Sequence, residues 1–222
     1  MMTDKRVDGD LAGPRFCGEV SAAVSHEIKN VLAIIKETAG LLDDRAGRAQ
    51  AEALPLAPDQ VREATRAVDR QVRRADAIVR RLNRFAHSVD RESEAVELGE
   101  SCRLLAELAD RMLAGRGATL EVLAEAPEVT VQTSHFRLLQ FLWRGLSAVL
   151  AAAGNGARLQ LTVAARPEKK SGGRVELRWQ TAAPTPVGGP EFPGPAELEL
   201  LAQLAWQFEL NPDEQHFVLL LP

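Results

Sequence analysis

Two long stretches of apolar residues at spacings of three and four constrain this fold more than any other feature of the sequence. The first stretch runs from Phe16 to Leu42, and the second runs from Val61 to Phe85. This spacing places apolar side chains along one face of an α-helix. We therefore predict one long amphipathic helix over each stretch.

The segment between the two stretches carries signals that end one helix and begin the next. Asp43-Asp44-Arg45-Ala46-Gly47 interrupts the apolar pattern, so we predict a first helix over about residues 15–43. Pro55 and Pro58 follow, and Pro58 suits the first turn of a second helix that reaches about residue 88. We expect the two helices to form an antiparallel hairpin.

A hairpin with one apolar stripe on each helix does not enclose a core of its own. Two such hairpins can pack together as a four-helix bundle with coiled-coil-like contacts. We therefore expect a homodimer. The alternative is a monomer in which the hairpin lies on the second half of its own chain.

The second half of the chain alternates between strand and helix patterns. In order, we predict a short strand at 96–98, a helix at 100–113, strands at 118–123 and 129–133, a helix at 136–153 capped by Ser134, strands at 158–164 and 174–179, a helix at 196–208 and a strand at 217–221. This order predicts helices on one face of a mixed sheet. The fold class is α+β, with a hairpin domain over residues 1–90 and an α/β sandwich over residues 95–222.

Composition excludes several classes of function. The formal net charge of −4 argues against a dedicated nucleic-acid binder. The N-terminus is charged, without the apolar core of a signal peptide, and the apolar stretch at 146–153 is too short to span a bilayer. Cys17 and Cys102 are isolated thiols outside any metal-ligand pattern. We expect a cytoplasmic protein without a membrane segment or a bound metal.

His26 is the candidate reactive residue. At about 100° of rotation per residue, its side chain points away from the apolar stripe that contains Val24 and Ile28. Its neighbours one turn away include Ala22 and Asn30, which are small or polar. The imidazole should therefore be exposed and open to a bulky partner. On spacing alone, an ordinary surface histidine is an equal alternative.

Two neighbours of His26 suit phosphoryl chemistry. Near neutral pH one imidazole nitrogen can attack phosphorus, while the other carries a proton and needs an acceptor. Glu27 is the candidate acceptor. Asn30, one turn further on, is a candidate for positioning a water molecule that hydrolyses a partner's phosphoryl group.

These residues also carry a family resemblance. The run Ser25-His26-Glu27-Ile28-Lys29-Asn30-Val31-Leu32-Ala33 resembles the H-box of bacterial sensor histidine kinases. Residues 71–86 resemble the second helix of the same dimerisation and phosphotransfer domain. Val31 stands where a proline is common, which should only straighten the helix.

The order of elements over residues 95–222 resembles the ATP-binding domain of these kinases, but the nucleotide motifs are lost. Arg144 and Ala148 match the two asparagines of the N-box. Gln180-Thr181-Ala182-Ala183-Pro184 matches the Asp-x-Gly-x-Gly segment, and Gly194-Pro195-Ala196-Glu197-Leu198 matches the glycine-rich phosphate loop. The three losses together predict a pseudokinase that does not bind ATP.

A histidine acceptor without a working kinase domain must obtain its phosphoryl group from another protein. The resemblance therefore implies a histidine phosphotransferase of a two-component phosphorelay, which passes the group between aspartates of response-regulator receiver domains. His26 would be the acceptor and Glu27 its orienting residue. The receiver would supply magnesium, so no cofactor is expected in the chain itself, and a hybrid histidine kinase is a further implied partner.

The resemblance also implies a docking surface around His26. Its expected members are Lys29, Ala22, Ala33, Arg73 and Arg74. Two alternative functions would use the same surface. In the first, the chain is a non-catalytic regulator that docks on a kinase or receiver. In the second, it is a receiver-directed phosphatase that depends on Asn30.

Overall fold

The computed structural model describes residues 5–124, 128–166, 172–181 and 190–222. Contacts divide the chain into two compact units: Val20–Arg84 forms one, and Met1–Glu19 together with Phe85–Pro222 forms the other. The domain boundary near residues 90–95 stays a prediction.

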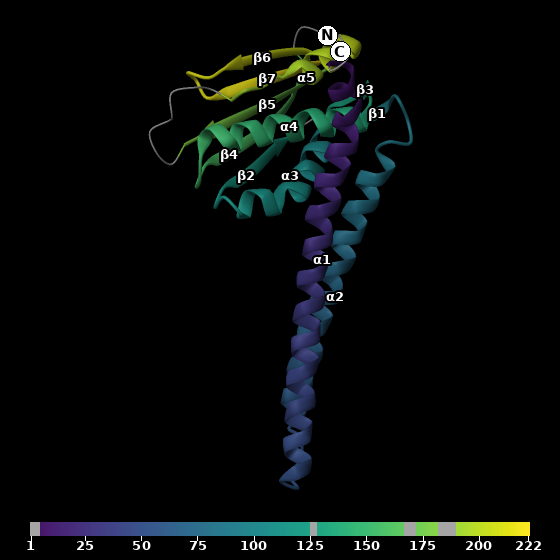
Figure 1. Cartoon of the computed structure of the whole chain (residues 1–222), viewed down its shortest axis with the longest axis vertical. Coiled ribbons are helices and arrows are strands. Elements are labelled where there is room, and N and C mark those ends of the chain that lie inside the picture. The colour runs from purple at the N-terminus through teal and green to yellow at the C-terminus, as the bar shows by residue number, and fades with distance from the viewer. Residues whose placement is uncertain (1–4, 125–127, 167–171, 182–189) are drawn as a thin grey trace. The chain divides into compact units, whose positions relative to one another are not determined.

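The unit Val20–Arg84 is a helical hairpin. Its helices are parts of α1 (Lys5–Ala51) and α2 (Pro58–His87), which run side by side (Figure 1). Val20, Val24 and Val31 of α1 are buried. The predicted hairpin is therefore confirmed, as is the start of α2 at Pro58. No helix in the described part of the chain is long and apolar enough to cross a membrane.

The predicted end of the first helix near residue 43 is wrong. The helix continues through Asp43 and Gly47 to Ala51. Leu42, Ala46 and Ala49 remain half-buried at spacings of four and three, so the apolar face outlasts the polar run. One glycine in a helix costs only about 1 kcal/mol relative to alanine, which favourable neighbours can offset.

Among its described residues, the larger unit contains two sheets and three further helices. The elements are β1 (Glu94–Glu97), α3 (Leu98–Ala114), β2 (Thr119–Ala124), β3 (Thr130–Thr133), α4 (His135–Ala153), β4 (Arg158–Ala165), β5 (Gly173–Gln180), α5 (Pro195–Gln203), β6 (Gln207–Asn211) and β7 (His216–Leu221). The main sheet has the order β2-β4-β5-β7-β6, and β1 pairs with β3. β2 is parallel to β4 and the other pairs are antiparallel, so the predicted mixed sheet and α+β class are confirmed.

The core of this unit lies between the main sheet and the helices on one of its faces (Figure 1). Leu159, Leu161 and Val163 alternate along β4 toward this side, and all three are buried. Ser134 caps α4 as predicted, because its Oγ accepts a hydrogen bond from the Arg137 N–H at 3.4 Å.

The predicted helix over 196–208 is too long. α5 ends at Gln203, and the chain then forms β6, which pairs with β7 through Phe208 opposite Leu219. Trp206 extends the helical spacing in the sequence, but residues 207–211 alternate polar and apolar side chains, as a strand does. Pairing with β7 satisfies the backbone groups of this segment, and that partner is not visible in local sequence.

The ends of α1 and α2 that belong to the larger unit, up to Glu19 and from Phe85, are packed there by aromatic side chains. The Phe16 ring lies 5.2 Å from Phe85 and 5.6 Å from both Phe136 and Trp143, measured between centroids. The Trp143 indole N–H donates to Glu19 Oε2 at 2.7 Å. Aromatic pairs at these distances add about 0.5–1.5 kcal/mol each beyond burial.

Two glycine-to-alanine changes should have opposite effects. A Cβ on Gly145 would lie 2.9 Å from Cζ of Phe217 and 3.2 Å from Cε1 of Phe192, so Gly145→Ala should cost about 1–3 kcal/mol. Gly47 is exposed in α1 with nothing within 4 Å of its Cβ position, so Gly47→Ala should stabilise by up to about 1 kcal/mol. Urea unfolding measures both free energies, and a stabilising Gly145→Ala would contradict this packing.

Candidate functional site

His26 lies on an exposed face of α1. Ala22, Lys29, Asn30 and Ala33 are also exposed, and they stand three, four or seven residues from His26. On a helix these spacings make one continuous strip of surface. The structure therefore brings the imidazole together with four of the residues expected to contact a partner.

Glu27 lies on the inner side of the hairpin, and its partner there is Arg81 of α2. Arg81 Nη2 donates to Glu27 Oε2, forming an ion pair whose side chains are only 14% and 9% exposed for arginine and glutamate. Water is largely excluded from this pair, so its charges attract each other more strongly than a surface pair. The carboxylate next to His26 is therefore held from the opposite helix.

Sequence reasoning did not single out Arg81, although a signal was present. Arg81 lies three residues after Ile78 and four before Phe85, both of which are buried. An arginine at a position on this apolar stripe of α2 is expected to have a buried guanidinium. A buried charge needs a partner of opposite charge. Glu27 occupies the equivalent place in α1, between Val24 and Val31.

Arg73 and Arg74 lie elsewhere on the hairpin. Both are exposed, and Arg73 Nε contacts Asp69 Oδ2 at 3.0 Å. They precede Arg81 by seven and eight residues, which is about 10–12 Å along the helix at 1.5 Å per residue. The structure therefore does not place these two arginines beside His26. Any contact they make with a partner would be separate from the immediate surroundings of the imidazole.

Glu197 lies in the segment of the larger unit that the sequence resemblance leads us to expect at the phosphate loop. Its Oε2 accepts from the Gly194 N–H at 3.0 Å, and its Oε1 accepts from Arg144 Nε at 3.4 Å. The carboxylate is buried and closes the N-terminus of α5 from within the chain. Because helix N-termini attract anions, a carboxylate held there opposes a phosphate group at the same place.

Aromatic rings fill the space between α4 and the sheet strands beside it. Phe192, just before α5, packs with ring centroids 5.0 Å from Phe141, 5.3 Å from Phe208 and 5.8 Å from Phe217. Phe141 also contacts Trp206 at 5.8 Å. Ala148 is half-buried and offers no oxygen or nitrogen ligand in its side chain. Of the segment matched to the adenine site, residues 182–184 lie outside the described residues.

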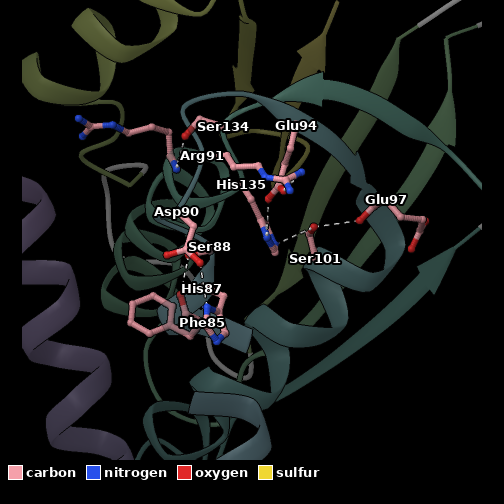
Figure 2. Close-up of polar contacts among 11 residues, drawn as sticks. Phe85, His87, Ser88, Asp90, Arg91, Glu94, Glu97, Ser101, Ser134 and His135 are labelled. Carbon is pink, nitrogen blue, oxygen red and sulfur yellow. Dashed lines mark hydrogen bonds and ion pairs between the residues drawn. The ribbon is translucent and has the colours of Figure 1, made fainter. Parts of the chain in front are cut away.

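A second polar cluster lies where β1, α3 and α4 begin (Figure 2). Ser101 Oγ is 3.2 Å from His135 Nε2, and His135 Nδ1 is 3.8 Å from Glu94 Oε1. The order resembles that of a nucleophilic triad. However, Ser101 is buried and its hydroxyl donates to the Glu97 carbonyl at 2.9 Å, so it is no accessible nucleophile. The cluster joins the three elements structurally.

The buried thiol Cys102 is no candidate for the chemistry. Burial raises the pKa of the Cys102 thiol to about 12, which keeps it protonated and unreactive at neutral pH. Within the described ranges, no three His, Cys, Asp or Glu side chains gather closely enough to hold a metal ion.

Comparison with known proteins identifies the hairpin. Residues 18–89 match the family model of the His Kinase A (phospho-acceptor) domain, so the predicted histidine-kinase-like dimerisation and phosphotransfer domain is confirmed. No curated protein sequence matches the chain.

Solved structures of similar fold include histidine kinases and a phosphotransferase. The catalytic domain of histidine kinase ThkA is 14% identical, with a TM-score of 0.47 over 60% of this chain and 97% of that one. The Acinetobacter baumannii histidine kinase AdeS is 11% identical, with a TM-score of 0.44 over 84% and 95%. A bacterial phosphotransferase is 15% identical, with a TM-score of 0.47 over 91% and 93%. The residues of the site itself therefore decide what the chain can do.

Proposed function

We propose that this chain is a histidine phosphotransferase of a bacterial two-component phosphorelay, acting in the cytoplasm. It takes a phosphoryl group from the aspartate of one receiver domain onto His26 and passes it to the aspartate of another, without binding ATP. The observation that carries the proposal is an exposed His26 in a phospho-acceptor domain, in the same chain as a phosphate-loop segment closed by Glu197.

The exposed strip around His26 supports the transfer step. An imidazole nitrogen attacks phosphorus, the bond from phosphorus to the aspartyl oxygen breaks, and its electron pair returns to the receiver carboxylate. The proton on the other imidazole nitrogen stays in place. Glu27, the acceptor expected from the sequence, lies on the inner side of the hairpin with Arg81, so it would have to turn toward His26 to accept that proton. Ala22 and Ala33 leave room for a receiver domain, which would bring the magnesium ion that neutralises the phosphoryl oxygens. A hybrid histidine kinase is the kind of protein that would carry the donor receiver.

A homodimer is supported by a second apolar stripe on α2. Val61, Val72 and Val79 recur at spacings of 11 and 7 residues, which places them on one line along the helix. Their exposed fractions in the single chain are 37%, 53% and 44%. An exposed apolar line of this length suits a second hairpin, so we propose that two chains form a four-helix bundle.

Asn30 supports a second candidate function. It is exposed one turn from His26 on the same strip, within reach of the same docked receiver. A receiver-directed phosphatase would use its amide to position the attacking water. A regulator without catalysis is the third use of the surface.

Labelled receiver domains test the transfer. The receivers are taken from the response regulators and hybrid kinases of the same genome, and each is phosphorylated on its aspartate with radiolabelled acetyl phosphate. We expect at least one of them to transfer acid-labile label to the chain. His26→Ala should abolish the label, whereas His87→Ala, which changes an exposed histidine bound to Asp90, should retain it.

Unchanged label on His26→Ala, or no label on the wild type with any of these receivers, would contradict the transfer. Release of free phosphate alone, lost in Asn30→Ala, would favour the phosphatase.

Nucleotide binding provides an independent test of the larger unit. Because Glu197 closes the phosphate-loop segment and Phe192 fills the adjacent space, calorimetric titration with magnesium and ATP should show no saturable binding below roughly millimolar concentration. Micromolar affinity would show that this unit retains a nucleotide site.

Two valines of equal exposure test the dimer. Val72 lies on the α2 stripe and Val89 lies beyond the end of α2, with exposed fractions of 53% and 54%. Val72→Asp should shift the mass measured by light scattering from two chains toward one, because it buries a charge in the bundle. The Val89→Asp protein should keep the mass of two chains, as in the wild type. A monomeric wild type would contradict the proposal.

A further inference from the structure

We propose that the main sheet of the larger unit binds an acidic amino acid, glutamate or aspartate, on the face turned away from α3 and α4. The site is a hollow of about 270 Å³ lined by residues of β2, β4 and β5. It involves neither His26 nor the hairpin. The inference therefore goes beyond the proposed phosphotransferase and does not depend on it.

Two polar side chains from each of three neighbouring strands form the walls of the hollow. The strand register arranges them in two rows, Glu121-Gln160-Arg178 and Thr119-Arg158-Gln180. Leu159 and Trp179 lie between these residues in the sequence and are buried. Because successive side chains of a strand point to opposite faces, the six polar side chains share the face away from the helices (Figure 1).

The hollow contains two positive charges and one negative charge. Arg158 and Arg178 are diagonal neighbours on antiparallel strands, about 7–8 Å apart, so one small ligand can reach both exposed guanidinium groups. Within the described ranges, no acidic side chain contacts Arg158. Gln160 Nε2 donates to Glu121 Oε2 at 3.3 Å, which orients the carboxylate beside the arginines. The hollow is therefore positive overall, although the chain carries a net charge of −4.

A buried carboxylate fixes Arg178 in position. Arg178 Nε lies 2.6 Å from Glu176 Oε1, and Arg174 Nη2 lies 2.7 Å from Oε2 of the same carboxylate. The Glu176 side chain is 8% exposed, whereas that of Arg178 is 54% exposed. Glu176 contacts the Nε side of the Arg178 guanidinium, so its Nη groups can donate to a ligand. A guanidinium that is already ordered loses less conformational freedom when it binds.

The pattern of charges indicates the class of ligand. Arginine binds both carboxylates and phosphates through two parallel hydrogen bonds. Glu121 discriminates between them, because its carboxylate repels a doubly charged phosphate and attracts an ammonium group. A ligand with two carboxylates and one ammonium group complements two arginines and one glutamate. Sites for drug-sized ligands occupy about 300–1,000 Å³, so this smaller hollow suits a single amino acid.

Calorimetric titration of the full chain tests the site. The probes are L-glutamate, L-aspartate, glutarate and inorganic phosphate, each at neutral pH and low salt. We expect at least one of the two amino acids to bind saturably with a Kd of roughly 0.1–1 mM, as for a small ligand held by a few charged contacts. Glutarate lacks the ammonium group, so it should bind about tenfold more weakly, and so should phosphate.

Three single variants locate the binding. Arg158→Gln should weaken amino-acid binding about tenfold or more, because it removes one charged partner of the ligand. Arg111→Gln is the matched control, since it also removes an exposed positive charge but lies in the last turn of α3, outside the hollow. It should match the wild type. Glu121→Gln should abolish the preference for L-glutamate over glutarate, because the partner of the ammonium group is lost.

The absence of saturable binding of either amino acid to the wild type would overturn the inference. Unchanged affinity in Arg158→Gln would also overturn it, because the ligand would then bind elsewhere. Tighter binding of inorganic phosphate than of both amino acids would do the same, as would a preference for L-glutamate over glutarate that persists in Glu121→Gln. No step needs a receiver domain, so these results and the transfer assay succeed or fail separately.

Discussion

An amphipathic helix must bury its apolar face, and the two long helices of this chain satisfy that requirement by packing on each other. The pairing of α1 with α2 determines which side chains point inward and which remain outside. His26 is exposed because Val24 and Val31 are buried on the opposite side of the same turns. Glu27 is inside for the same reason, and Arg81 compensates its charge there. The surface offered to a partner therefore follows from the packing of the hairpin.

In the larger unit, ion pairs and aromatic rings occupy the places where the sequence resemblance leads us to expect a nucleotide site. The Glu197 carboxylate lies at the start of α5 and accepts from the Gly194 N–H, and the Arg144 guanidinium donates to the same carboxylate. Phe192 and its aromatic neighbours occupy the space beside α4. Phe136 and Trp143 of this unit also pack against Phe16, which lies in the N-terminal part of α1.

Local sequence patterns predicted much of the fold. The three-and-four spacing located both helices of the hairpin, and Pro58 located the start of α2, because these signals depend only on neighbouring residues. Gly47 does not end α1, since a single glycine is a weak signal against a continuing apolar face. Strand β6 was missed because its pairing with β7 depends on residues that are distant along the chain. The buried face of α1 contained Glu27, but its partner lies 54 residues away.

The sequence by itself determined the candidate acceptor and its exposure, since the direction of His26 follows from helical periodicity alone. It also predicted that the nucleotide motifs are lost, because a motif is a matter of residue identity. Only the tertiary structure decided what replaces them and what Glu27 contacts. Arg81, Glu197 and Phe192 gain their roles from partners on other elements. Such contacts depend on how elements pack, and packing is a property of the whole fold that no local pattern encodes.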